Sequence, residues 1–125
     1  MVGNILLLGK DSGLLTTRAE LLMVAWSVKA VPPNRLAEAL VAVPFDLAIF
    51  CHSMTLADVE TSAKQFRRFN PTSPILWLQE DPQQLDSIGK YEVLPLPVYP
   101  MILIGMIDKI LSKSERLDLK RRLSH

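Results

Sequence analysis

The residues best suited to chemistry in this chain of 125 residues are Cys51 and His52, which follow directly on an apolar run at 47–50. A thiol next to an imidazole suggests a nucleophile and its base, since an imidazole can activate a thiolate. Successive residues of an extended strand point to opposite faces, so the two side chains need not meet. The sequence therefore favours a small buried Cys51 over a catalytic one, and we expect no enzymatic activity.

A second set of polar residues, Gly9, Lys10 and Asp11, follows the first apolar run of the chain. The segment 3–11 superficially resembles a phosphate-binding loop, but its glycine spacing is wrong and Asp11 stands where that loop needs a hydroxyl. Lys10 could hold an anion above the strand ends, or it could pair with Asp11 or Asp81. The ion pair is the favoured interpretation.

Composition narrows the function classes. Hydrophobic residues make up 49% and charged residues 22%, and the net charge is +1, which gives no argument for a nucleic acid or a membrane as partner. No apolar stretch reaches the roughly 20 residues of a spanning helix, and Cys51, His52 and Asp11 lack the spacing of a metal site. We expect one cytoplasmic domain over 1–125, without metal or cofactor, in which 114–125 extend the last helix or form a tail.

The hydrophobic pattern alternates between strand and helix five times. Short apolar runs bounded by polar residues predict strands at 4–8, 28–31, 46–51, 74–79 and 92–96. Between and after them, apolar residues recur at helical spacing, with Asp11 or Ser12, Asn34 and Thr55 as candidate N-caps. This pattern predicts a flavodoxin-like (βα)5 three-layer sandwich, an α/β fold whose parallel sheet has the strand order 2-1-3-4-5.

The first and last helices have the clearest inward faces. We expect the first to bury Leu14, Leu15, Ala19, Leu22, Met23 and Trp26, with Arg18 off this stripe. The last should bury Met101, Ile104, Ile107, Ile110 and Leu111. The segment 81–90 has the weakest pattern and predicts a short or poorly packed helix.

The chain resembles a response-regulator receiver domain of two-component signalling from about residue 5 to residue 113. Three segments carry the resemblance: D-L-A-I-F-C-H-S-M for the family's third strand and the loop after it, P-I-L-W-L for the fourth strand, and L-P-L-P-V before the last helix. Pro97 matches a proline that the family usually holds in the cis form. The resemblance implies a phosphorelay protein of bacterial type.

The residues that carry the family's chemistry differ here. Cys51 occupies the position of the phosphorylated aspartate, and Gly9-Lys10 that of the acidic magnesium-binding pair. Gln79 corresponds to the family's hydroxyl residue, Leu96 to its lysine and Val93 to its switch aromatic. The resemblance is thus to a degenerate pseudo-receiver, whose altered phosphoacceptor pocket we expect to comprise Gly9, Lys10, Asp11, Cys51, His52, Gln79, Leu96 and Pro97.

The resemblance implies a signalling module that acts by phosphorylation-independent binding to another protein or to a second copy of itself. In the family, the fourth and fifth strands and the last two helices form the output and dimer surface. The corresponding residues here are Ile88, Tyr91, Val98, Tyr99, Met101 and Ile102. The alternative is a small-molecule or anion sensor that uses the remodelled pocket of Gly9, Lys10, Cys51, Gln79 and Leu96.

Overall fold

The computed structural model describes residues 3–79, 92–95 and 99–123, and the fold is an open sheet of five parallel strands. The strand order is β2-β1-β3-β4-β5, which confirms the predicted topology. The strands are β1 (Asn4–Leu8), β2 (Ser27–Val31), β3 (Leu47–Phe50), β4 (Ile75–Gln79) and β5 (Glu92–Pro95). Their parallel register brings all five carboxyl ends to one edge of the sheet.

The three central strands are buried on both faces, and this explains their uninterrupted apolar sequences. Residues 5–8, 47–50 and 75–78 are all buried. β2 lies at the edge of the sheet and alternates exposed with partly buried positions before its buried last residue, Val31. A parallel strand covered by helices on both sides needs no polar face, whereas an edge strand keeps one.

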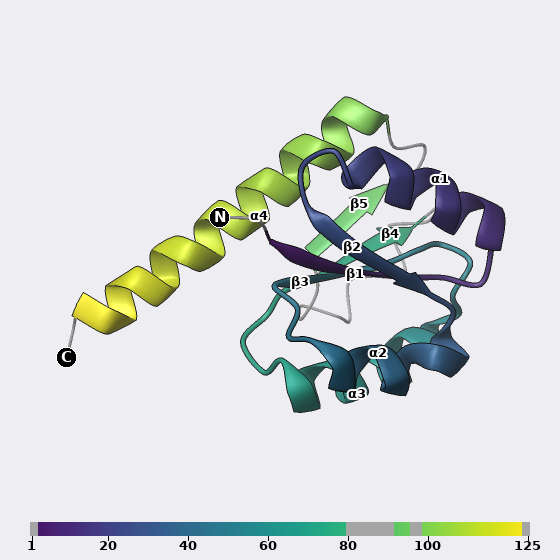
Figure 1. Ribbon diagram of the computed structural model, residues 1–125, viewed down its shortest axis with the longest axis horizontal. Coiled ribbons are helices and arrows are strands. Elements are labelled where there is room, and N and C mark those ends of the chain that lie inside the picture. Colours follow the sequence, from purple (N-terminus) through teal and green to yellow (C-terminus); the bar gives the residue numbers. More distant parts are fainter. Residues whose placement is uncertain (1–2, 80–91, 96–98, 124–125) are drawn as a thin grey trace.

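Helices cover both faces of the sheet (Figure 1). α1 (Ser12–Leu22) and α4 (Pro100–Leu123) pack on one face, where Leu15, Ala19, Leu103 and Ile107 belong to one buried cluster. The 3₁₀ turn η1 (Pro33–Arg35), α2 (Leu36–Ala42) and α3 (Leu56–Phe69) lie toward the other face. There Leu36, Leu40, Val59 and Phe66 join a second buried cluster with Phe50 and Trp77 from the sheet.

Two predictions about the first half of the chain need correction, and one is confirmed. α1 ends at Leu22, so Met23 is exposed and Trp26 only partly buried in the loop that follows. Asn34 does not cap a helix, because Pro32 and Pro33 set up the 3₁₀ turn and α2 begins without a side-chain cap. Thr55 does cap α3, in a reciprocal capping box with Asp58.

The inward face of α4 differs from the predicted one at its start. Leu103, Ile107 and Ile110 are the buried positions, whereas Met101 is 84% exposed. Met101 lies two positions before Leu103, which is about 200° around the helix, so its side chain faces away from the sheet. Figure 1 shows that the far end of α4 projects away from the sheet, toward the C-terminus. The predicted helix at 81–90 lies outside the described residues.

Within the described ranges, no helix combines the length and the apolar character that crossing a membrane requires.

Candidate functional site

The site predicted at the carboxyl edge of the sheet is built from the residues that follow β1 and β3. The backbone N–H of Cys51 donates to the carbonyl oxygen of Leu8 at 2.9 Å, which fixes the two chain segments side by side. Gly9 is buried between them: a Cβ atom there would lie 3.0 Å from Cβ of Cys51 and 3.2 Å from Oγ of Ser53. The structure therefore brings Gly9 and Cys51 together, as predicted, and packs them closely.

Cys51 is buried at 2% exposure in the apolar cluster beneath α1 and α4. Burial raises the pKa of its thiol above the ordinary value, because the thiolate would lose its solvation. The guanidinium of Arg18, on α1, opposes this increase in pKa, and the carboxylate of Asp11 adds to it. The net increase favours the neutral thiol, which is a weak nucleophile.

Lys10 forms an ion pair, as predicted, but with a different partner. Its Nζ lies 2.6 Å from Oδ2 of Asp58, in the first turn of α3, and its backbone N–H donates to Oγ of Ser53 at 2.9 Å. The pKa of Asp58 falls to about 2, first because of Lys10 and then because of the N–H and hydroxyl of Thr55. The predicted partner Asp81 lies outside the described residues. The pair with Asp58 links the loop after β1 to the start of α3.

Asp11 begins α1 instead of facing the strand ends. Its Oδ1 accepts from the backbone N–H of Leu14 at 3.1 Å, as an N-cap does. The magnesium ion that the resemblance implies prefers several hard oxygen ligands in a compact set. Gly9 supplies no ligand and Lys10 supplies a cation, so these residues do not fit that ion. In the part of the chain that the structure describes, no group of three acidic, histidine or cysteine side chains could hold a metal.

The structure describes five of the other predicted site residues, at three places in the fold. His52 is half-buried directly after Cys51, and Gln79 is partly buried at the end of β4. Tyr99, Met101 and Ile102 are exposed where α4 begins. Leu96, Pro97, Ile88, Tyr91 and Val98 lie outside the described residues.

Sequence reasoning gave no role at the strand ends to two residues that the structure places there, Arg18 and Asp58. Arg18 was set aside because it falls off the apolar stripe of α1, yet its Nη1 is buried and meets no hydrogen-bond acceptor in the described structure. Asp58, three residues after Thr55, is an acid in the first turn of α3. The capping box with Thr55 was the available signal for its fixed position, but nothing in the sequence linked it to Lys10.

Comparison with known proteins supports the fold through structure alone. No family model matches the chain, and no curated protein matches it in sequence. A response-regulator receiver protein from Sinorhizobium medicae WSM419 aligns with TM-score 0.77 and 20% identity, over 90% of this chain and 97% of that one. An adenylate cyclase structure from Rhodopirellula baltica aligns with TM-score 0.80 and 20% identity, over 98% and 97%.

A third similar structure is the receiver domain of a sensor histidine kinase from Pseudomonas aeruginosa PAO1, which was solved with magnesium in its active-site cleft. It aligns with TM-score 0.74 and 16% identity, over 90% of this chain and 99% of that one. These identities are low, but the alignments span nearly the whole length of both chains. The chain therefore has the flavodoxin-like fold of response-regulator receiver domains.

Proposed function

We propose that this chain is a signalling interaction module that binds another protein, or a second copy of itself, without phosphorylation and without enzymatic activity. The receiver fold supports a signalling role. The observation that carries the proposal is the exposure of three large side chains where α4 begins: Tyr99 at 64%, Met101 at 84% and Ile102 at 53%. We call these three residues the α4 patch.

The chemistry of the α4 patch suits a protein interface. Tyrosine and methionine are enriched at interfaces, tyrosine because its ring is apolar and its hydroxyl can still hydrogen-bond, methionine because it is flexible and polarizable. Exposed apolar side chains that gather in one place mark interaction sites more often than isolated ones. The proposed interface also includes Ile88, Tyr91 and Val98, which the receiver family places on the same output surface.

The strand-end residues support the phosphorylation-independent part of the proposal. A buried neutral thiol at Cys51 cannot replace a carboxylate as the acceptor of an acyl phosphate. Lys10 already pairs with Asp58, so its charge is partly neutralised within the chain. We expect Mg²⁺ with beryllofluoride, a phosphoryl mimic, to leave the melting temperature and the tryptophan emission unchanged. A saturable response would contradict this part.

The interface itself is tested by sedimentation velocity over a range of protein concentrations, followed by affinity capture. We expect Met101→Glu and Ile102→Glu to reduce self-association, or capture of a partner, at least tenfold. Met23→Glu is the matched control, because Met23 is also exposed, at 56%, but lies in the loop after α1. A strictly monomeric protein that captures no partner would contradict the proposal, and so would equal effects of Met101→Glu and Met23→Glu.

A second candidate function, anion sensing at the strand ends, is favoured by Arg18. The guanidinium of Arg18 lies within reach of the Cys51 thiol, a weak acceptor, but its buried Nη1 meets no acceptor with hydrogen-bond geometry in the described residues, which is costly. A small anion there would supply the missing acceptor. Inorganic phosphate should then raise the melting temperature of the wild type but not of Arg18→Gln. Equal stabilisation of both proteins would exclude Arg18 as the binding group.

A further inference from the structure

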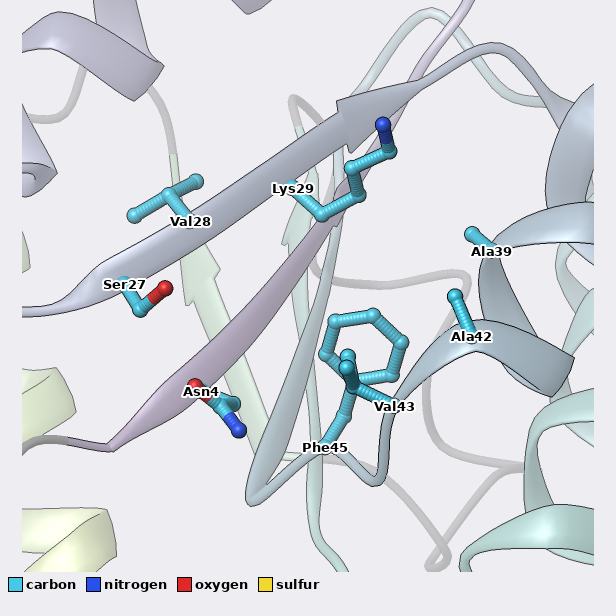
Figure 2. A pocket seen from close by; sticks show the side chains of 8 residues that line it. All are labelled: Asn4, Ser27, Val28, Lys29, Ala39, Ala42, Val43 and Phe45. Atoms are coloured by element: carbon cyan, nitrogen blue, oxygen red, sulfur yellow. The ribbon is translucent and has the colours of Figure 1, made fainter.

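A cavity of about 240 Å³ lies at the opposite edge of the sheet from the predicted site, where the strands begin. Asn4 is the first residue of β1, Ser27 is the first residue of β2, and Phe45 lies two residues before β3. Figure 2 shows Asn4 and Ser27 on one side, Ala39 and Ala42 of α2 on the other, and the ring of Phe45 between them. The cavity therefore separates the edge strand from the short helix that covers it.

The cavity exists because α2 presents small side chains to the edge strand. Ala39 and Ala42 carry only methyl groups, and these do not fill the space above β2. Phe45 forms a fixed floor: it is 3% exposed, its N–H donates to Oδ1 of Asn70 at 2.9 Å, and its carbonyl oxygen accepts from Oγ of Ser73 at 2.6 Å. A braced floor of this kind favours a preformed cavity over collapse of the space.

The lining has an apolar body and a single charge. Its apolar members are Val28, Ala39, Ala42, Val43 and Phe45. Its polar members are Asn4, Ser27 and Lys29, of which only Lys29 is charged, and Nδ2 of Asn4 already donates to the carbonyl oxygen of Pro44 at 3.2 Å. Lys29 is exposed, as are Ala42 and Val43, whereas Phe45 and Ala39 are buried. The cavity thus has a closed apolar floor and a cationic side open to solvent.

We propose that this cavity binds a small carboxylic acid with an aromatic or branched aliphatic body. The body would pack on Phe45 between β2 and α2, and the carboxylate would pair with the ammonium group of Lys29. The cavity is smaller than the roughly 300–1,000 Å³ of sites for drug-sized ligands, so it suits a molecule of about ten non-hydrogen atoms. For such a ligand we expect a dissociation constant on the order of 0.1–1 mM.

The test is an NMR titration of the intact protein with phenylacetate, and in parallel with phenylacetamide, its uncharged analogue. Phenylacetate should shift the amide signals of β2 and α2 in a saturable way, and phenylacetamide should bind more weakly. Lys29→Gln should weaken phenylacetate binding roughly three- to fivefold, as expected for an exposed ion pair, and leave phenylacetamide binding unchanged. Lys64→Gln, on the exposed side of α3, is the matched control for loss of one positive charge.

A second variant tests the cavity itself. Ala42→Leu should fill the space and abolish binding of both compounds, and it should not unfold the protein, because leucine is a good helix former at an exposed helical position. Three outcomes would overturn the proposal: no saturable shift below about 10 mM, unchanged binding in Ala42→Leu, or equal affinity for phenylacetate and phenylacetamide. None of these outcomes bears on the α4 patch, so the two proposals fail separately.

Discussion

At the carboxyl ends of the strands, Gly9, Cys51 and Ser53 are closely packed, and Lys10 pairs with Asp58. At the amino ends, a cavity lies between β2 and α2, and the exposed Lys29 borders it. A lysine lies near each end, but within the described part of the chain only Lys10 of these two pairs with a carboxylate. Receiver-like folds place their chemistry at the carboxyl ends. In this protein Gly9, Cys51 and Ser53 are packed together at that edge, and a cavity between described residues lies at the other edge.

The difference between the two edges shows which properties follow from the fold and which follow from the particular residues. The parallel sheet brings the residues after β1 and β3 together whatever their identity. Whether they form a pocket depends on their size and charge, and here a thiol, a hydroxyl and a lysine contact neighbouring parts of the chain. Ala39 and Ala42, on α2, are small residues that border a cavity.

The largest effect should come from disturbing the packing at the carboxyl edge. Gly9→Val would force a side chain against Cβ of Cys51, and overpacking of this kind costs about 1–3 kcal/mol of unfolding free energy. Urea denaturation followed by tryptophan emission measures the loss. Gly105→Ala is the control, since a Cβ there meets nothing within 4 Å, and it should raise stability by about 0.5–1 kcal/mol because alanine favours helix. An unchanged midpoint for Gly9→Val would mean that the edge is not packed as described.

An intermediate effect is expected at the amino edge. Asn70 is 6% exposed and accepts the N–H of Phe45, so Asn70→Ala would leave a buried N–H without its partner. The expected cost is about 1–2 kcal/mol of unfolding free energy. Because the floor of the cavity would loosen, this variant should also bind phenylacetate more weakly. Gln65→Ala, on the exposed surface of α3, serves as control, and similar losses in both variants would argue against a braced floor.

The smallest effect should come from the ion pair between Lys10 and Asp58, measured by urea denaturation between pH 7 and pH 2.5. The pKa of Asp58 is about 2 in the folded protein against an ordinary 3.8, so its contribution to stability is present above about pH 4 and lost as the pH falls toward 2. Lys10 is 50% exposed, which screens the pair and limits the contribution to below about 1 kcal/mol.

Asp58→Asn should therefore narrow the stability difference between neutral and acidic pH, and Lys10→Met should do the same. Glu60→Gln, on the exposed side of α3, provides the comparison. If the unfolding free energy of Lys10→Met depended on pH as that of the wild type does, the ion pair with Lys10 would not be what lowers the pKa of Asp58 in solution.

Sequence patterns predicted the fold well because a strand that is buried on both faces has an uninterrupted apolar sequence. The uninterrupted apolar runs at β1, β3 and β4 identified the central strands, and Thr55 as an N-cap identified the start of α3. The ends of helices were predicted less well. Met23 and Met101 fit apolar stripes, yet both are exposed, because α1 ends at Leu22 and Met101 lies on the side of α4 opposite to the buried Leu103.

The sequence by itself determined which residues follow each strand, and parallel pairing then places the residues after neighbouring strands at one edge. That is why the closeness of Gly9 and Cys51 was predictable. Only the tertiary structure decided the contacts that depend on the relative position of separate helices and strands: the ion pair from Lys10 to Asp58, the approach of Arg18 to Cys51, and the cavity between β2 and α2. Such contacts join residues that are far apart in the chain. Their distances depend on how the helices pack on the sheet, and the local periodicity of the sequence does not predict this packing.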